Sequence, residues 1–490
     1  MEPKRILIGG EWVEAKSGAT YENLNPATGE VICHVASAGA EEVDLAVATA
    51  RRAFEKHWAP MDPTARAALM YKLADRIDER AEELGRMETC DMGKPYSQAA
   101  GGDVPGAAAF FRYFAGLADK LEGETLITPP NTFGYTLREP QGVVAAIMPW
   151  NFPICMCGIK GGPALAAGNC IIFKPAPASP TTALEVGKMA LEVGFPPGVI
   201  QVLPDGDGAA GAALSRHPGV DKVSFTGSTK TGRKVLESSA HNLAKVTLEL
   251  GGKTANIVMP DADMDMALAA AVRTIFLNSG QICTAGSRLL LHESIKDEFL
   301  EKMLGVVRSL KVGDPFAPDT KLGPIVSAQQ YERVMSYIEA GKSCGACVLT
   351  GGGRPTEAAL AAGTYVMPTI FDKVTMDMPI AQEEIFGPVL AVLSFKDDDE
   401  AVAIANATDY GLAAALWTRD GSRAHNLARR LQAGIIWINC TNIFGPWMPY
   451  GGYKVSGLGF ECGIEGLKEF TRIKTVLMDT SNRPERWALD

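Results

Sequence analysis

A cysteine with unusually small neighbours is the first candidate for chemistry in this sequence. Cys283 lies in FLNSGQICTAGSR, residues 276–288, where Gly280, Thr284 and Gly286 stand close by. Cysteines that only fill a core usually have large apolar neighbours. A thiol left accessible by small side chains favours a nucleophile. Such a thiol needs thiolate character, donors for an oxyanion and a base.

Three polar residues elsewhere in the chain could meet these needs. Glu249 lies in LELGGK at the end of an apolar run, where a carboxylate is costly unless it is paired or functional. Asn151 in PWNFP could donate its amide to developing negative charge, and Lys174 ends the run IIFK. Each of them alone would fit a surface or turn residue equally well. Because ligands bind beyond the carboxyl ends of parallel strands, the set predicts a common site with Cys283.

Short β-rich runs alternate with helix-like segments over most of the chain, which predicts parallel sheets covered on both faces. The runs form two series, at 142–150, 169–176, 198–204, 222–228 and 245–252, and then at 255–260, 288–292 and 388–395. The spacing of apolar residues predicts amphipathic helices over 37–58 and 64–89. We therefore expect two α/β domains that meet near Gly251.

Two segments outside this alternation are typical of exposed strands. Residues 121–138 predict two strands joined by a Pro-Pro-Asn turn, and TRIKTVLMD at 471–479 predicts another. Exposed strand edges are normally paired or covered, and pairing with a second subunit is one way to cover them. We expect a homodimer or homotetramer.

Composition excludes several classes of function. The 490 residues exceed a single core, and the net charge of −10 without basic blocks disfavours nucleic-acid binding. Prolines and a lysine interrupt the most apolar region, so no membrane span is expected. Ten cysteines without a secretory signal indicate a reducing, cytoplasmic location. Cys344 and Cys347 have no partner pair at zinc spacing, so no metal is predicted.

Four short motifs bear on nucleotide binding or hydrolysis. FTGSTKTG (225–232) runs from a strand through Gly-Ser into a helix, whose N-terminus suits a pyrophosphate, although a plain turn explains it equally well. GDGAAG (206–211) fits G-x-G-x-x-G but lacks the acidic partner expected about 20 residues later. GGKT (251–254) lacks the first P-loop glycine, and GKSCG (341–345) follows a helix instead of a strand, so both are rejected.

Taken in order, eight short stretches of the chain resemble the aldehyde dehydrogenase superfamily, in its non-acylating NAD(P)-dependent form. The resemblance rests on PWNFP (149–153), FKPA (173–176), GFPPGV (194–199), FTGST (225–229), LELGGK (248–253), GQICTAGSR (280–288), EEIFGPV (383–389) and PYGGYKVSG (449–457). It implies a Rossmann-like NAD(P)-binding domain at 1–119 and 139–250 and a catalytic domain at 251–455. The segments 120–138 and 471–490 would form a small β bridging domain for oligomerisation.

The resemblance also implies a reaction, the oxidation of an aldehyde to its carboxylic acid. Cys283 attacks the aldehyde to give a thiohemiacetal, whose oxyanion is held by the Asn151 amide and the Cys283 N–H. Hydride transfer to the nicotinamide leaves a thioester, and Glu249 activates the water that hydrolyses it. The small neighbours of Cys283 then leave room for substrate, water and nicotinamide.

Cofactor contacts follow from the same resemblance. Lys174 and Glu384 would bind the two riboses, Gly227 and Ser228 the pyrophosphate, and Trp150 and Phe386 would line the cleft. The full predicted set is Met148, Pro149, Trp150, Asn151, Lys174, Pro177, Phe225, Thr226, Gly227, Ser228, Thr231, Glu249, Leu250, Gly251, Glu384 and Phe386.

Two departures from the family pattern matter. Pro177 stands where many NAD-preferring members have a ribose-binding glutamate, so NAD is expected while NADP stays open. Phe460 replaces an arginine beside Glu461, which puts a proton-relay role for Glu461 in doubt.

Positions that match the family's substrate tunnel are apolar or aromatic, which favours an aromatic or medium-chain aldehyde. They are Phe152, Met156, Ile159, Leu277, Ile282, Phe444, Trp447 and Tyr450. No arginine among them would clamp a carboxylate, and Ile159 stands where betaine-aldehyde enzymes tend to have Trp. Several could equally well only pack the tunnel wall.

Alternatives stay open at this point. A CoA-acylating member would not need Glu249, and a semialdehyde-specific dehydrogenase would need a carboxylate clamp. A non-catalytic structural or binding member would not need to keep Cys283, Glu249 and Asn151 together. A thiol hydrolase would need a histidine partner, and none lies in the motifs above.

Overall fold

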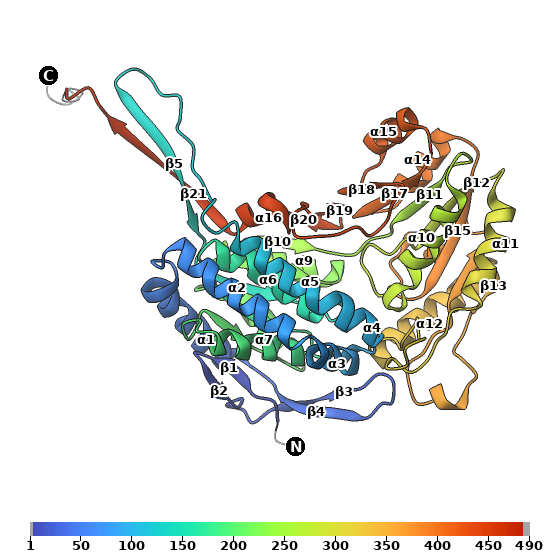
Figure 1. Ribbon diagram of the computed structural model, residues 1–490, viewed down its shortest axis with the longest axis horizontal. Helices are drawn as coiled ribbons and strands as arrows, with labels where there is room; N and C mark the ends of the chain where they lie inside the picture. The colour runs from blue at the N-terminus through green and yellow to red at the C-terminus, as the bar shows by residue number, and fades with distance from the viewer. Residues whose placement is uncertain (1–2, 484–490) are drawn as a thin grey trace.

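Two large, mostly parallel sheets organise residues 3–483, the part of the chain that this computed structural model describes (Figure 1). The outer ends of the segments predicted at 1–119 and 471–490, residues 1–2 and 484–490, lie outside the described residues. The predicted fold class, two open parallel α/β sheets with a small β element, is confirmed.

The first sheet has five parallel strands at its centre. In spatial order they are β8 (Ile200–Val202), β7 (Cys170–Lys174), β6 (Val143–Ile147), β9 (Lys222–Thr226) and β10 (Lys245–Glu249). Antiparallel β1 (Ile6–Ile8) and β2 (Glu11–Val13) extend one edge, and β20 (Gly457–Leu458) the other. Every residue of β6 and β7 is buried, as expected for strands covered on both faces.

The direction of the crossovers defines where a ligand should bind. From β6 the chain passes through α6 (Pro153–Ala166) to β7 and through α7 (Thr181–Glu192) to β8. It then returns through α8 (Ala209–Arg216) to β9 and continues through α9 (Thr229–Ser239) to β10. The chain thus leaves the neighbouring strands β6 and β9 in opposite directions. The crevice beyond their carboxyl ends is the topological switch point, where open α/β sheets bind ligands.

The N-terminal helices cover this sheet, with one correction to the prediction. The helix expected over 37–58 forms as α1 (Ala40–Ala53) and a π-helical turn, Phe54–Trp58. The single helix expected over 64–89 is wrong: the segment forms α2 (Pro63–Glu79) and α3 (Ala81–Met92), broken at Arg80. Arg80 leaves helical geometry and pairs with Glu83 and Glu185, which redirects α3 onto α7. The helices α4 (Tyr96–Gln98) and α5 (Val104–Ala115) follow.

The second sheet has seven strands, parallel except at one edge. Their order is β13 (Cys347–Thr350), β14 (Thr369–Asp372), β15 (Val389–Phe395), β12 (Arg288–His292), β11 (Ala255–Val258), β17 (Ala413–Trp417) and β18 (Ile435–Ile438). Its helices are α10 (Met264–Phe276), α11 (Lys296–Val307), α12 (Ala328–Ser343), α13 (Pro379–Gln382), α14 (Asp398–Asn406) and α15 (Gly421–Arg430). The chain passes from one sheet to the other between Glu249 and Ala255, near the predicted meeting point.

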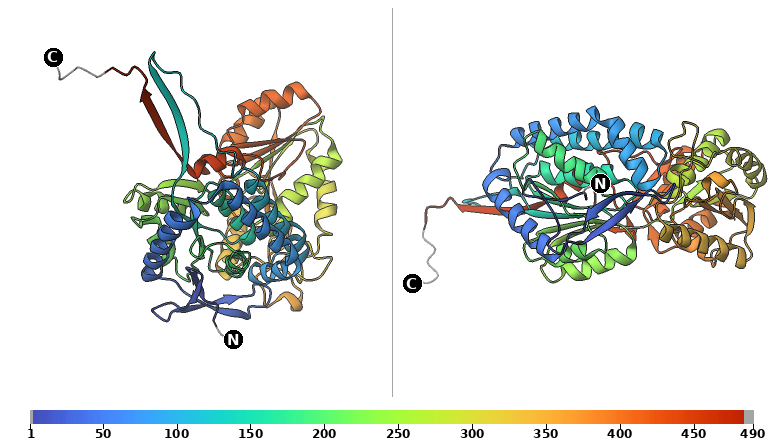
Figure 2. Two further views of the ribbon diagram at one scale, coloured as in Figure 1. Left: turned by 60° about the vertical axis from the view of Figure 1, so that its left-hand side comes forward. Right: turned by 90° about the horizontal axis from the view of Figure 1, so that it is seen from below.

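A two-stranded ribbon projects from these bodies (Figures 1 and 2). β5 (Thr132–Pro140) pairs antiparallel with β21 (Thr471–Asp479) over nine residues of each strand, so the strand predicted at 471–479 is confirmed. The first of the two strands predicted in 121–138 is wrong. Residues 121–131 run beside β5 with an isolated bridge between Thr125 and Tyr135, where Leu126 N donates to Gly134 O at 2.9 Å and Thr136 N to Glu124 O at 2.8 Å, but they form no extended ladder.

The remaining elements are small. They are β3 (Thr20–Leu24) paired with β4 (Val31–Ala36), β16 (Tyr410–Gly411) paired with β19 (Tyr453–Lys454), and α16 (Gly463–Glu469). Within residues 3–483, no helix is long and apolar enough to cross a membrane. The most apolar region of the sequence forms β6, α6 and β7 instead.

Candidate active site

Cys283 follows a left-handed stretch of backbone at the end of α10. Asn278, Ser279 and Gly280 have φ values of 49°, 53° and 74°. The Asn278 side-chain amide donates to the carbonyl oxygens of Asn151 and Gln281 at 3.2 and 3.3 Å, and the Ser279 hydroxyl donates to Gly323 O at 2.8 Å. Left-handed non-glycine residues cost about 1–3 kcal/mol each and persist only where their surroundings hold them. This loop is therefore held in one conformation.

Two glycines allow the backbone to close around the thiol. A side chain at Gly280 would clash with the carbonyl of Gly387. A side chain at Gly252 would clash with the carbonyl of Cys283 itself. Because Gly252 has no side chain, the turn that follows Glu249 packs directly against the Cys283 loop. The two sheets therefore meet at the predicted nucleophile.

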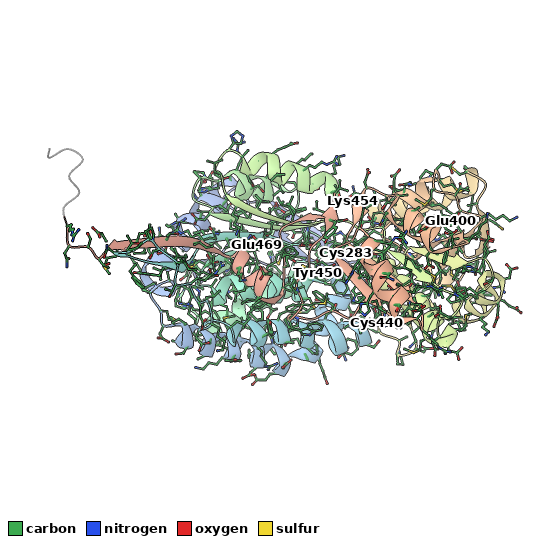
Figure 3. All side chains as sticks on the ribbon, turned by 90° about the horizontal axis from the view of Figure 1, so that it is seen from above. Cys283, Glu400, Cys440, Tyr450, Lys454 and Glu469 are labelled. Atoms are coloured by element: carbon green, nitrogen blue, oxygen red, sulfur yellow. The ribbon has the colours of Figure 1, made fainter. Side chains whose placement is uncertain are left out.

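The Cys283 thiol is half-buried and its Sγ lies 3.0 Å from the Tyr450 hydroxyl, at the junction of the two bodies (Figure 3). Burial raises the pKa of Cys283 to about 12, and the negative charges of Glu384 and Glu249 act in the same direction. The Tyr450 hydrogen bond lowers this pKa. The resting thiol is thus protonated at neutral pH, and Tyr450 is the side chain that favours its ionisation.

Glu249 is a buried carboxylate without a partner. It ends β10, is 3% exposed, and neither of its carboxylate oxygens has a hydrogen-bond partner among residues 3–483. Burial raises its pKa well above the usual value; the charge of Glu461 raises it further and Lys160 opposes the rise. An unpaired buried carboxyl is destabilising, and groups held in this way gather at functional sites.

Asn151 is clamped to the cysteine loop. It is buried beyond the end of β6, and its side-chain Nδ2 donates to Gln281 O at 3.0 Å. An asparagine amide carries two N–H groups, so one remains for a ligand. The main-chain oxygen of Asn151 accepts from Lys94 Nζ at 2.9 Å and from Asn278.

Sequence reasoning missed the charged network beneath Asn151. Lys94 is buried, forms an ion pair with Asp103, lies 3.7 Å from Glu88, and sits 3.9 Å from the centre of the Phe152 ring. Glu88 accepts from the main-chain N–H of Ile154 at 3.1 Å. The network fixes the segment that carries Asn151. No motif signals it, because its members are joined only by the packing of α3, α5 and α6.

A second missed cluster lies behind Glu249. Lys160 on α6 is fully buried, forms an ion pair with Glu461 and donates to the Ser224 hydroxyl at 3.0 Å. Phe460, which replaces an arginine of the family pattern, is 43% exposed beside this cluster. Glu461 therefore has a buried cation as partner, and its charge acts on Glu249.

The predicted cofactor residues gather at the switch-point edge of the first sheet. Ser228 caps α9 by accepting from Thr231 N at 3.2 Å, and Gly227 and Ser228 are accessible. The Thr226 hydroxyl is buried without a partner among residues 3–483. Trp150 and Phe386 meet edge to face with centroids 5.2 Å apart. An orphaned hydroxyl and an open helix N-terminus fit a dinucleotide.

The other predicted cofactor residues surround this edge. Glu384 accepts from the main-chain N–H of Gly252 at 3.0 Å, and burial raises its pKa to about 7. Lys174 ends β7 as predicted, but it pairs with Asp205, which the sequence did not single out. Phe225 lies in β9, and the rest follow β6, β7 or β10: Met148, Pro149, Pro177, Leu250 and Gly251.

The predicted substrate residues split into two groups. Phe152, Met156, Ile159, Leu277 and Ile282 are buried or half-buried in the two cores. Phe444 and Trp447 are 42% and 59% exposed. Phe444 contacts Tyr450 at a ring-centroid distance of 5.2 Å and Phe110 at 5.5 Å, so an aromatic series reaches from the surface to the thiol. Phe110, on α5, was missed because nothing in its spacing separates it from a core residue.

A thiol, a buried carboxyl and a side-chain amide are held where two parallel-sheet bodies meet, in the arrangement of an α/β enzyme. The chain belongs to the aldehyde dehydrogenase family, whose model matches residues 12–476. Mitochondrial aldehyde dehydrogenase of Rattus norvegicus is 46% identical over 475 residues, which cover 96% of this chain and 91% of that protein. The predicted family and enzyme class, an NAD(P)-dependent aldehyde dehydrogenase, are thereby confirmed.

Solved structures agree with this assignment. PnpE of Pseudomonas sp. WBC-3 is 44% identical, with a TM-score of 0.97 and coverage of 100% of both chains. PnpE in complex with nicotinamide adenine dinucleotide has the same TM-score and identity and covers 99% of both. A betaine aldehyde dehydrogenase of Staphylococcus aureus in complex with NAD+ is 38% identical, with a TM-score of 0.97 and coverage of 99% of this chain and 96% of that one.

Replacing Gly280 by alanine should destabilise the enzyme by at least about 1–3 kcal/mol, because a left-handed residue would gain a side chain that clashes with Gly387. The measurement is the free energy of unfolding in denaturant. Gly305→Ala is the matched control, since this glycine of α11 has open space around it and alanine favours helix by about 0.5–1 kcal/mol. Equal stability of the Gly280 variant and wild type would contradict the account.

Replacing Tyr450 by phenylalanine removes one oxygen atom and keeps the contact with Phe444. Because the lost hydrogen bond lowers the pKa of Cys283, the rate of alkylation by iodoacetamide should rise toward its plateau at higher pH than in wild type. Tyr453→Phe, which changes an exposed tyrosine, serves as the control. An unshifted pH profile for the Tyr450 variant would exclude this role.

Proposed function

We propose that this enzyme oxidises apolar aldehydes to carboxylic acids with NAD+, through a covalent intermediate on Cys283. The observation that carries the proposal is the unpaired, buried carboxyl of Glu249, close enough for its charge to act on the Cys283 thiol. Burying the Cys283 thiol and the Glu249 carboxyl destabilises the fold. Covalent acyl chemistry uses the thiol as nucleophile and the carboxyl as base.

The first half of the reaction belongs to Cys283. The thiol loses its proton to solvent water, the Tyr450 hydroxyl stabilises the thiolate by donating a hydrogen bond to sulfur, and the sulfur attacks the carbonyl carbon of the aldehyde. The second N–H of the Asn151 amide and the main-chain N–H of Cys283 hold the resulting oxyanion, and losing one such donor typically slows a reaction about 10²–10³-fold. The bound cofactor supplies an acceptor for the hydride. The acyl group then remains on Cys283 as a thioester.

The second half belongs to Glu249. Its carboxylate takes a proton from water as the water oxygen adds to the acyl carbon, and the carbon–sulfur bond breaks to release the acid and the thiolate. Burial raises the pKa of Glu249, and a carboxylate with a raised pKa is a stronger base toward the proton of water. A base for water also argues against coenzyme A as the acyl acceptor.

The cofactor assignment rests on the chain's own edge residues. Gly227 and Ser228 at the start of α9 would hold the pyrophosphate, Lys174 and Glu384 the riboses, and Trp150 with Phe386 would bound the nicotinamide side. The NAD complexes of PnpE and of the betaine aldehyde dehydrogenase support NAD as the cofactor.

The substrate class follows from the aromatic series that leads to the thiol. Phe110, Phe444 and Tyr450 form apolar walls, which favour an aromatic or medium-chain aldehyde over a charged one. A cytoplasmic location and the division into cofactor, catalytic and bridging domains remain part of the proposal.

We further propose that the ribbon of β5 and β21 joins subunits into a dimer or tetramer. It projects from the body, and its apolar side chains are exposed, Ile473 by 61% and Leu477 by 66%. Such a strand edge and apolar surface are normally covered, and a second copy of the chain would cover them.

Two variants test the reaction together. Glu249→Gln should accumulate an acyl adduct on Cys283 after one normal turnover of NADH formation, because hydrolysis loses its base. Cys283→Ala should form neither adduct nor NADH. Stopped-flow absorbance of NADH and mass spectrometry of the quenched enzyme, with hexanal or benzaldehyde as substrate, measure both outcomes.

Full steady-state turnover by Glu249→Gln, or an adduct on a residue other than Cys283, would refute the mechanism. Release of an acyl-CoA on adding coenzyme A would assign the acylating alternative.

Charged side chains introduced on the ribbon test whether it forms the proposed subunit interface. The double substitution Ile473→Glu with Leu477→Glu should shift the enzyme to monomers, measured by sedimentation velocity, since charges on an apolar interface are not desolvated cheaply. Leu236→Glu, on the exposed side of α9, is the control. An unchanged oligomer in the ribbon variant would contradict the proposed interface.

A further inference from the structure

Lys174, the residue proposed to face a ribose, is already paired with a carboxylate. Its Nζ lies 2.5 Å from Asp205 Oδ1, and the two side chains are 7% and 0% exposed. The other oxygen of Asp205 accepts the main-chain N–H groups of Ala210 and Gly211, at 3.0 and 3.3 Å. Asp205 is thus fixed by the start of α8 and cannot turn away from the lysine.

Asp205 directly precedes the glycine-rich motif GDGAAG (206–211), to which no role has been assigned so far. It lies three residues beyond the end of β8, directly before GDGAAG, and β8 is the neighbour of β7 in the sheet. Gly211 packs over the lysine stem, since a side chain there would lie 3.7 Å from its Cδ and Cε. The motif therefore brings a carboxylate to the edge where Lys174 ends β7.

The pairing changes what the lysine can bind. An ammonium group has three N–H donors, so two remain after the contact with Asp205. These can serve a neutral ribose diol. A 2′-phosphate carries a charge of about −1.5 to −2 at pH 7. It would meet a lysine whose charge is already balanced and a carboxylate that repels it, and like charges at close range oppose binding.

We propose that Asp205 makes this enzyme selective for NAD+ over NADP+. Pro177 stands where a ribose-binding glutamate is expected, and Asp205 supplies the missing negative charge from a different strand end. The proposal rests on the proposed function, because it requires Lys174 to face the adenosine ribose.

Titration calorimetry of the full chain with NAD+ and NADP+, without aldehyde, tests this independently of turnover. Wild type should bind NAD+ at least about tenfold more tightly than NADP+. Asp205→Asn should change the ratio of the two dissociation constants by at least about tenfold in favour of NADP+, since one charged contact is commonly worth a factor of ten or more. Asparagine keeps an oxygen that can accept from Ala210 and Gly211.

Asp207→Asn is the matched control. Asp207 lies in the same loop, is exposed, and accepts from Ala209 N at 3.0 Å, so its loss removes the same charge without touching Lys174. Its ratio should stay at the wild-type value. An equal effect of the two variants, or wild type that binds both cofactors equally well, would overturn the proposal.

The variant Lys174→Gln distinguishes a failure of the selectivity proposal from a failure of the proposed reaction. The variant should weaken binding of both cofactors. If NAD+ binding is unchanged, the placement of the ribose is wrong and the selectivity proposal falls with it, while the adduct on Cys283 still reports on the reaction. If Asp205→Asn fails to fold, as judged by its thermal melting, Asp205→Ser, which also caps helices, and the wild-type ratio decide the question.

Discussion

The close approach of Gly252 to the carbonyl of Cys283 is the contact on which the rest of the structure depends. It joins the turn after the last parallel strand of one sheet to the loop before a strand of the other. Any side chain at that position would part them. The left-handed residues 278–280, the hydrogen bonds on Asn151 and the hydrogen bond from the Gly252 N–H to Glu384 all hold this junction closed from different sides.

Around that junction the charges are arranged unevenly. The charges of Glu249 and Glu384 act on the thiol, and the charge of Glu461 acts on Glu249. The buried cation Lys160 is paired with Glu461. Burial therefore raises the pKa of both Cys283 and Glu249. The pKa values of these two groups depend on hydration and hydrogen bonding, and a substrate that enters the site changes both.

Sequence alone predicts most strands of the two sheets and nominates the candidate site residues, because both leave local signals. β6, β7 and β15 are runs of apolar residues buried on both faces, and Cys283, Glu249 and Asn151 lie in distinctive short motifs. The break at Arg80 depends on a tertiary partner, Glu185. The pairs of Lys94 and Asp205 also depend on the folded chain. Asp103 lies nine residues from Lys94, and Lys174 lies thirty-one residues from Asp205.

The protonated resting state of Cys283 has a consequence outside the catalytic cycle. Peroxides and other oxidants attack the thiolate form of cysteine, and accessible thiolates are the ones converted to sulfenic and sulfinic acids. An enzyme that holds its sulfur as a neutral thiol between turnovers spends little time in the vulnerable state. The burial that raises the pKa of Cys283 therefore also limits the amount of thiolate that an oxidant can attack.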